Sequence, residues 1–237
     1  MSVKVERAFI LGAGFGTRLR PYTDHCPKPM VQVAGRSLIW RSLDKLKDAG
    51  ISEVVVNTHY MADLLEQHLN QYDQDLIIHA VREEVILDTG GGVKNALHYF
   101  KDDPFFVIAG DNLWTDGHIA ALTRLMQHWD DTSMDILTLM HPIERMTLTH
   151  GVGDYNLCDD GKVRRSKDKS GTHMWTNIRL NSPHIYRDYP SNEFSFLNIM
   201  DDCERKGRFF ALEHDGDWHH ISTPADLENV NEQFCAA

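Results

Sequence analysis

The stretch Ala8-Phe9-Ile10-Leu11-Gly12-Ala13-Gly14-Phe15-Gly16-Thr17-Arg18 joins a short apolar run to three glycines at alternate positions. The run Ala8–Leu11 is too short for anything but one buried strand. Glycines leave backbone N–H groups free to converge on an anion, because no Cβ blocks a close approach. The stretch therefore predicts either a phosphate-binding loop after a buried strand or a tight turn after the first strand of an α/β protein.

The spacing of the loop excludes the two commonest phosphate-binding motifs. A dinucleotide fingerprint needs a glycine where Thr17 stands, and a P-loop needs Gly-Lys-Ser/Thr, which is absent. The loop instead contains Arg18 and is followed by Lys28 between two prolines. Arginine binds phosphate oxygens as a planar fork and lysine as a point charge. Two such cations beside a glycine loop suit a triphosphate whose inner phosphorus is attacked.

Composition predicts one soluble α/β domain over residues 1–237, with a substrate-side or lid region around 141–195 where polar, glycine-bearing segments interrupt the pattern. Apolar residues make up 42% and charged residues 25%, and no apolar run approaches the length of a membrane span. Residues 1–7 do not resemble a secretion signal, so we expect a cytoplasmic protein.

The formal net charge of −11 argues against a nucleic-acid surface. It also means that a nucleotide site needs local cations, backbone amides and a divalent ion. The four cysteines lie far apart without a Cys-x-x-Cys pair, which indicates reduced thiols rather than a disulfide or zinc framework.

Apolar patterns alternate between strand and helix along the whole chain. This alternation predicts an α/β fold with a largely parallel sheet, helices on both faces and ligands at the carboxyl ends of the strands. After the first strand, further strands are expected at 53–57, 76–81, 105–109, 135–140, 175–180 and 209–213, and helices at 37–49, 61–69, 93–100, 119–129, 196–206 and 224–234. The charged run 162–169 is expected to be a solvated hairpin.

Two later stretches carry candidate site residues. Leu87-Asp88-Thr89-Gly90-Gly91-Gly92 precedes the helix expected from Val93 and lets a flat or anionic group approach the backbone, unless it is only a flexible turn. Asp111 follows Gly110 at the tip of the strand expected at 105–109. Its carboxylate is a candidate Mg²⁺ ligand, although a Gly-Asp pair also caps ordinary loops.

The segment Gly14-Phe15-Gly16-Thr17-Arg18 with Pro27-Lys28 resembles the signature of the sugar-1-phosphate nucleotidyltransferases. The resemblance implies a Rossmann-like three-layer αβα sandwich with a mixed, mostly parallel sheet. It implies that the loop wraps a nucleoside triphosphate, that Arg18, Lys28 and Asp111 are catalytic, and that the backbone at Gly90 and Gly91 reads the base. The implied nucleotide-binding residues are Leu11, Gly12, Ala13, Gly14, Gly16, Thr17, Arg18, Lys28, Gly90 and Gly91.

Within that family, Leu87–Gly92 and Trp114-Thr115-Asp116 most resemble the N-acetylmuramate-1-phosphate uridylyltransferases. The resemblance implies sugar contacts at Asn112, Asp154 and Asn177. Asp111 would be the first metal ligand, and His220 stands where many relatives have the second acid. An imidazole suits Mn²⁺ and other softer ions better than Mg²⁺, so His220 is either a ligand, a phosphate contact or a structural residue.

The expected reaction joins a nucleoside triphosphate to a sugar 1-phosphate with release of pyrophosphate, with Mg²⁺, Mn²⁺ or another divalent ion as cofactor. UTP and N-acetylmuramate 1-phosphate are the preferred pair, in the recycling of cell-wall sugars. A mannose- or heptose-1-phosphate guanylyltransferase, a non-catalytic nucleotide-sugar sensor and a nicotinamide-dependent reductase are the alternatives. No nucleic-acid or membrane partner is expected, and the protein is expected to be a monomer or a small homo-oligomer.

Overall fold

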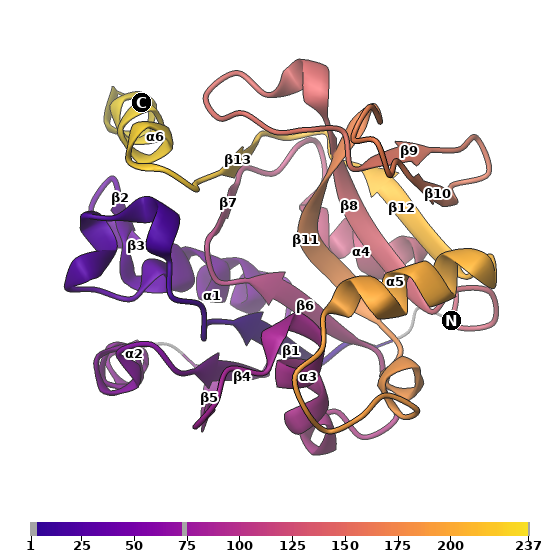
Figure 1. The fold of residues 1–237 in the computed structure, drawn as a ribbon, viewed down its shortest axis with the longest axis horizontal. Helices are drawn as coiled ribbons and strands as arrows, with labels where there is room; N and C mark the ends of the chain where they lie inside the picture. The colour runs from indigo at the N-terminus through magenta and orange to yellow at the C-terminus, as the bar shows by residue number, and fades with distance from the viewer. Residues whose placement is uncertain (1–3, 73–74, 237) are drawn as a thin grey trace.

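Helices cover both faces of a mixed β-sheet in the computed structural model, which describes residues 4–72 and 75–236 (Figure 1). Residues 1–3 of the N-terminal segment, for which no secretion signal is expected, lie outside this range. Among the described residues, none of the helices is both long and apolar enough to cross a lipid bilayer.

The main sheet has nine strands in the described part of the chain. Its strands are β1 (Arg7–Leu11), β4 (Glu53–Thr58), β5 (Ile77–Arg82), β6 (Phe105–Ala109), β8 (Ile136–Pro142), β9 (Tyr155–Leu157), β10 (Val163–Arg165), β11 (His173–Asn181) and β12 (Phe209–Glu213). The order is β5-β4-β1-β6-β11-β8-β12, and β9 and β10 extend from β11. The neighbours β5, β4, β1 and β6 are parallel, whereas β11 is antiparallel to β6 and β8.

Two layers of helices enclose this sheet. The helices are α1 (Leu38–Asp48), α2 (Ala62–Asn70), α3 (Asp88–Asn95), α4 (Ala121–His128), α5 (Phe196–Arg205) and α6 (Pro224–Ala236). Apolar residues of α1, α2 and α4 join one core cluster, and those of α3 and α5 join a second cluster on the opposite face. Figure 1 shows α3 and α5 on the near side of the sheet. The predicted three-layer αβα sandwich is therefore confirmed.

The central strand β6 shows why the sequence forms this sheet. All but the last of its residues are fully buried. Phe106 and Ile108 point into the first core, and Phe105 and Val107 into the second. Because successive side chains point to opposite faces, an uninterrupted apolar run is what a strand covered on both sides requires.

The parallel register brings three loops to one edge of the sheet. Leu11 at the end of β1 pairs with Asn57 of β4 and with Ala109 of β6. The glycine loop therefore emerges beside the ends of two neighbouring strands, as the parallel arrangement predicts.

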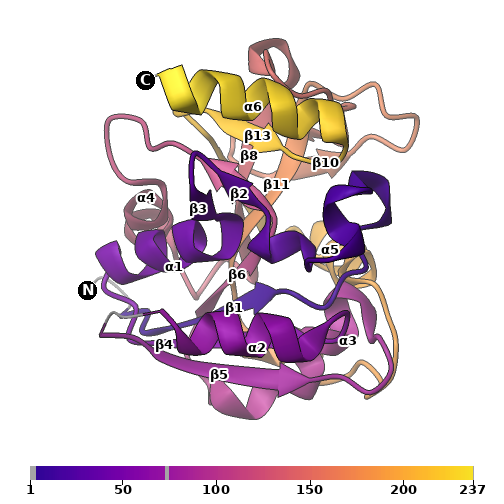
Figure 2. The ribbon, with the colours of Figure 1, turned by 90° about the vertical axis from the view of Figure 1, so that its left-hand side faces the viewer.

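A two-stranded ribbon, β7 (Asn112–Trp114) with β13 (Trp218–His220), joins the middle of the chain to its last helix. Leu227 and Val230 of α6 pack with Leu38 at the start of α1 in a third, smaller core cluster. Figure 2 shows α6 above α1 with β13 beside it. The ribbon is not predicted by the sequence pattern, because three-residue strands have no periodicity.

The helix after Leu87 differs from the prediction. We expect it to begin at Val93, but α3 begins at Asp88 and contains the three glycines, and a 3-10 turn (Leu97–Tyr99) follows it. The N–H groups of Gly90 and Gly91 donate to the carbonyl of Phe194, at 3.0 and 3.1 Å. Tertiary hydrogen bonds of this kind override the low helix propensity of glycine.

The predicted hairpin of the charged run is present in part. Strand β10 pairs antiparallel with β9. Arg165, however, is not merely solvated, because its guanidinium pairs with Asp201 of α5 at 2.8 Å.

Candidate functional site

A cavity of about 270 Å³ opens at the carboxyl ends of β1, β4 and β6. Predicted site residues line it together with residues that the sequence pattern does not single out. The predicted residues on its wall are Leu11, Gly12, Ala13, Gly14, Gly16, Lys28, Asp111 and Asn177. The others include Asn57 and Glu83, and the candidate stretch Leu87–Gly92 contributes Asp88 and Thr89. Of the remaining predicted residues, Thr17, Arg18, Gly90, Gly91, Asn112, Asp154 and His220 are not among its lining residues.

The glycine loop is packed against the segment that carries Lys28. Gly16 has φ of +62°, and a Cβ there would lie 3.0 Å from Thr23 Cγ2 and 3.1 Å from Lys28 Cβ. The hydroxyl of Thr23 donates to the Gly16 carbonyl at 2.8 Å. Only glycine combines this left-handed conformation with so close a contact. The loop and the lysine segment are therefore held together as one wall.

A buried polar network holds the other side of the loop. The N–H of Gly12 donates to Asn57 Oδ1 at 2.8 Å, and Asn57 Nδ2 donates to Glu83 Oε1 at 2.8 Å. The second carboxylate oxygen of Glu83 accepts the N–H of Leu87 at 3.0 Å. Asn57 is 3% exposed and Glu83 4% exposed. The network ties the loop to the chain entering α3.

Sequence reasoning misses Asn57 and Glu83. The only available signal is that each polar residue ends or follows an apolar strand at the edge where ligands of such sheets lie. That signal does not show that the two side chains meet.

Lys28 and Asp111 form an ion pair in the cavity. Lys28 lies on a short 3-10 turn (Lys28–Met30), and Asp111 follows β6 after a single residue, Gly110. Burial favours the neutral acid, but the charge and hydrogen bond of Lys28 outweigh it and hold the pKa of Asp111 below its ordinary value. The carboxylate is therefore ionised at neutral pH and available to a cation.

His220 lies beside this pair. In the ribbon it is paired with Asn112, the residue after Asp111. The backbone N–H of His220 donates a hydrogen bond to Thr149 Oγ1 at 3.1 Å. Burial lowers the pKa of His220, while the nearby Asp111 carboxylate opposes that shift. The imidazole is consequently neutral at neutral pH and able to offer a lone pair.

Asp111 and His220 form a donor set of two. Among the described residues there is no group of three or more His, Cys, Asp or Glu side chains that could hold a metal ion. Divalent ions in phosphoryl-transfer sites are held by one or two protein groups, water and the substrate's phosphates. The pair fits an ion that arrives with a nucleotide rather than a permanent protein-bound metal.

Arg18 and Thr17 lie on an exposed 3-10 turn (Thr17–Leu19) outside the cavity wall. The guanidinium of Arg18 lies close enough to His220 for its charge to help lower that imidazole's pKa. In the described part of the chain no ion pair engages Arg18. Its charge is thus free for an anionic ligand at the edge of the site.

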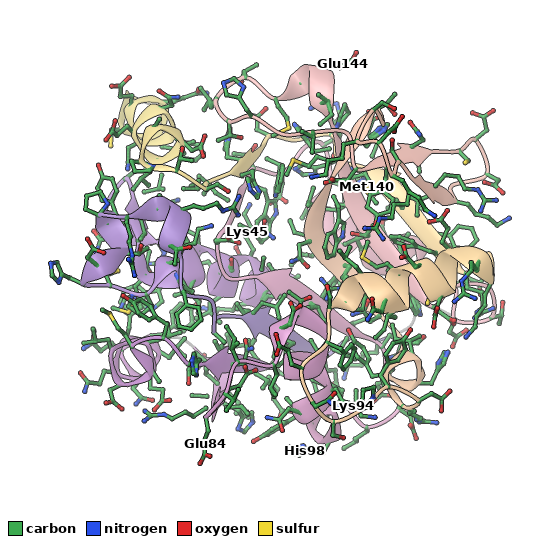
Figure 3. The ribbon with its side chains drawn as sticks, viewed as in Figure 1. Lys45, Glu84, Lys94, His98, Met140 and Glu144 are labelled. Atoms are coloured by element: carbon green, nitrogen blue, oxygen red, sulfur yellow. The ribbon has the colours of Figure 1, made fainter. Side chains whose placement is uncertain are left out.

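Gly90 and Gly91 face Phe194 rather than the cavity. Their N–H groups are already bound to its carbonyl, so they are not free to contact a base as expected. The preceding residues of α3, Asp88 and Thr89, line the cavity instead. Lys94 of the same helix, labelled in Figure 3, donates to the carbonyls of Tyr186 and Arg187 at 2.8 and 2.9 Å and secures the helix.

The three predicted sugar contacts have different surroundings. Asn112 is buried, accepts a hydrogen bond from Trp218 Nε1 at 3.1 Å and donates to the Asn177 carbonyl at 3.4 Å. Asn177 lines the cavity with φ of +58°. Asp154 is half-buried outside the lining set, and burial raises its pKa. Of the three, only Asn177 is placed on the wall.

The arrangement suits a polyanion. Backbone N–H groups of a glycine loop, a lysine and an unpaired arginine supply positive potential in a chain that is acidic overall. Asp111 and His220 lie beside Lys28, where they could hold a divalent ion together with phosphate oxygens.

Comparison with known proteins agrees with this description. The model of the nucleotidyl transferase family matches residues 7–233. The N-acetylmuramate alpha-1-phosphate uridylyltransferase of Caulobacter vibrioides is 34% identical over 230 residues, which cover 94% of this chain and 95% of that protein. The mannose-1-phosphate guanylyltransferase catalytic subunit beta of Xenopus tropicalis is 27% identical over 230 residues, which cover 93% of this chain and 62% of that protein.

The fold is also found in solved structures. The crystal structure of HddC from Yersinia pseudotuberculosis in complex with GMP-PN superposes with a TM-score of 0.75 at 24% identity, covering 97% of this chain and 100% of that one.

Proposed function

The chain belongs to the nucleotidyl transferase family and is a sugar-1-phosphate nucleotidyltransferase, and we propose that its substrates are UTP and N-acetylmuramate 1-phosphate. The choice of substrates is supported by the 34% identity to the Caulobacter uridylyltransferase over almost the whole length of both chains. We place the reaction in the cytoplasm, where nucleoside triphosphates are made.

The observation that carries the mechanism is the meeting of Lys28 and Asp111 on the wall of the glycine-loop cavity. A phosphate oxygen of the sugar phosphate attacks the α-phosphorus of UTP in line. The bond from that phosphorus to the bridging oxygen breaks, and pyrophosphate leaves. Because the phosphate nucleophile is already ionised at neutral pH, no general base is required. Catalysis is positioning and charge neutralisation.

In this proposal the groups around the cavity bind the phosphates and the divalent ion. The loop amides from Ala13 to Gly16 bind phosphate oxygens, while the Gly12 N–H stays on Asn57. Lys28 turns from Asp111 to the phosphates when the nucleotide enters. Arg18 closes on the outer phosphates from the edge of the site. Asp111 and His220 would hold Mg²⁺ or Mn²⁺, which would supply positive charge at the phosphate oxygens.

A pyrophosphate-release assay tests the proposal. The purified protein is given UTP, GTP, CTP, ATP or dTTP with N-acetylmuramate 1-phosphate, N-acetylglucosamine 1-phosphate, mannose 1-phosphate or heptose 1-phosphate, in Mg²⁺ or Mn²⁺. We expect the highest kcat/KM for UTP with N-acetylmuramate 1-phosphate. Faster turnover with any other pair contradicts the proposed substrates.

The same panel tests a second function. The 27% identity to a mannose-1-phosphate guanylyltransferase favours GTP with a mannose or heptose phosphate as the alternative. Nucleotide-sugar binding without pyrophosphate release in either metal would instead identify a sensor.

A further inference from the structure

An arginine is completely buried directly behind the cavity wall. Arg179 of β11 is 0% exposed, and its guanidinium stacks 3.8 Å from the ring centroid of Phe196 and 5.3 Å from that of Trp175. Among the described residues, no hydrogen bond from its Nε or Nη2 is formed and no carboxylate pairs with it; the polar groups that it meets, the Asn177 amide oxygen and the Tyr186 hydroxyl, are both uncharged. Burial lowers the pKa of Arg179 to about 10, so the group remains charged at neutral pH.

The position of Arg179 relative to the cavity follows from the strand register. Arg179 pairs with Val107 of β6, two residues before Ala109, and Ala109 lines the cavity. The buried charge therefore lies beneath the cavity rather than in a remote part of the core.

Arg179 is connected to the cavity through the side chain of Asn177. Its Nη1 donates to Oδ1 of Asn177, which lines the same wall as Lys28 and Asp111. An asparagine amide has one acceptor oxygen and one NH₂ donor group. Because Arg179 holds the oxygen, the NH₂ group is the end that Asn177 presents for a ligand. The left-handed backbone at Asn177 and the hydrogen bond from Asn112 to its carbonyl fix this orientation.

An unpaired charge in such a position is costly to the protein. A buried cation without a counter-ion loses its hydration, and its field is poorly screened by the surrounding apolar groups. An anion arriving at the Asn177 NH₂ group would lie one side chain away from the guanidinium, and its charge would partly offset the buried one. N-acetylmuramate differs from N-acetylglucosamine by a lactyl ether that ends in a carboxylate, so the proposed substrate supplies such an anion in addition to its phosphate.

We propose that Asn177 and Arg179 form a subsite for a carboxylate carried by the sugar, with the Asn177 NH₂ group as the contact and Arg179 as the positioning residue. The proposal rests on the proposed function and deepens it, because it names the feature of the sugar that is recognised. The buried charge selects an acidic sugar phosphate over its neutral counterpart.

Three variants separate charge from packing. Asn177→Asp places a carboxylate on Arg179, which satisfies the buried cation while removing the donor and adding a repulsive charge for the ligand. Arg179→Met removes the charge and keeps an unbranched side chain, and Arg179→Lys keeps the charge. Arg187→Met, at an exposed arginine paired with Asp102 after the same strand, is the matched control.

The primary measurement is calorimetric binding of UDP-N-acetylmuramate and UDP-N-acetylglucosamine, which requires no turnover. We expect Asn177→Asp and Arg179→Met to weaken binding of the acidic product by about 10- to 100-fold, the effect of one lost charged hydrogen bond, and that of the neutral product by less than about twofold. Arg179→Lys should retain part of the preference, and Arg187→Met all of it. In the assay, KM for N-acetylmuramate 1-phosphate should rise with kcat little changed.

Two results overturn the proposal. One is an equal loss of affinity for the acidic and the neutral product, which assigns Asn177 and Arg179 to a structural or phosphate-binding role. The other is an unchanged preference for the acidic product in both Asn177→Asp and Arg179→Met. If Arg179→Met does not fold, the binding measurements on Asn177→Asp decide the question. That variant should fold, because its new ion pair with Arg179 should raise the melting temperature. Failure of the proposed function is separate, since it appears as absence of turnover with UTP in the unaltered protein.

Discussion

Lys28 and Asp111, 83 residues apart in the chain, are joined by an ion pair at the wall of the cavity. In the absence of a nucleotide each group neutralises the other. Under the proposed mechanism, the pair would hold a cation for the phosphates and a carboxylate for a divalent ion at one point. Entry of a nucleotide with its ion would then exchange one ion pair for two without leaving either side chain's charge unpaired.

Replacing Lys28 by Met should lower kcat/KM by about 10²- to 10³-fold, because a preorganised charge at the phosphates is lost. The variant should also raise the pKa of Asp111, since the charge that lowers it is gone. The acid limb of the pH–rate profile should therefore move to higher pH. Lys162→Met, at a partly exposed lysine paired with Asp160 outside the cavity wall, is the control and should leave both quantities unchanged. A variant at position 28 with normal turnover would remove Lys28 from the mechanism.

Gly16→Ala should destabilise the glycine loop. The left-handed φ and the contacts with Thr23 and Lys28 leave no room for a Cβ, and we expect a loss of about 1–3 kcal/mol in the free energy of unfolding. Gly14→Ala is the matched control for stability, because nothing lies within 4 Å of a Cβ there and its φ is not positive. Urea denaturation of the two variants measures the difference, and equal stabilities would contradict the strain.

Glu83→Gln should weaken the buried network behind the loop. The new NH₂ group must face either the Asn57 NH₂ group or the Leu87 N–H, so one buried donor loses its acceptor, at a cost of about 1–3 kcal/mol. The KM for UTP should rise as well, because Asn57 then no longer holds the Gly12 N–H in place. Glu84, exposed and labelled at the rim of the molecule in Figure 3, provides the control Glu84→Gln. If the two variants behave alike, the network does not support the loop.

The stability of the protein should fall as the pH decreases from about 6.5 to about 4. Burial, together with the nearby charges of His214 and Arg145, lowers the pKa of His141 from 6.5 to about 4, and Asp217 opposes the shift. The unfolded chain therefore binds a proton in this window that the folded protein does not, which amounts to about 3 kcal/mol at full effect. His141→Leu should flatten the decrease. His150→Gln, at an exposed position, should not. Urea denaturation midpoints of the unaltered protein and the two variants, measured from about pH 6.5 to about pH 4, test this. An unchanged pH dependence in His141→Leu would contradict the prediction.

Removal of divalent ions with EDTA should abolish turnover, and His220→Asp should shift the metal preference. A second carboxylate beside Asp111 favours Mg²⁺, whereas imidazole favours Mn²⁺. We expect the ratio of Mg²⁺- to Mn²⁺-supported kcat/KM to rise by about tenfold or more in His220→Asp. Thr149→Val is the control. It removes the hydroxyl that accepts the backbone N–H of His220 but leaves the imidazole in place, so the ratio should stay unchanged. A constant ratio in His220→Asp would indicate that His220 is not a ligand.

The sequence predicts the strands of the central sheet better than the connections around the site. Strands β6 and β12 have the expected boundaries, because apolar runs buried on both faces have a clear length and end at polar or turn residues. Helix α3 was expected five residues too late, because its start depends on hydrogen bonds to Phe194, about a hundred residues away. No local pattern contains that information.

The candidate site shows the same limit. The glycine loop, Lys28 and Asp111 are recognisable because each occupies a distinctive local motif, although their catalytic roles stay predictions. Asn57 and Glu83 are missed because their importance lies in meeting each other across two strands. Arg179 is missed because an arginine in a strand ordinarily indicates an exposed face, and here the strand is covered on both sides.

The ribbon between β7 and β13 sets the order in which the site can be assembled during synthesis. A ribosome releases the glycine loop, Lys28 and Asp111 more than a hundred residues before His220. The proposed metal-binding pair of Asp111 and His220 can therefore form only after β13 has been made and has docked on β7. Under the proposed mechanism, nucleotide turnover would begin only at that point.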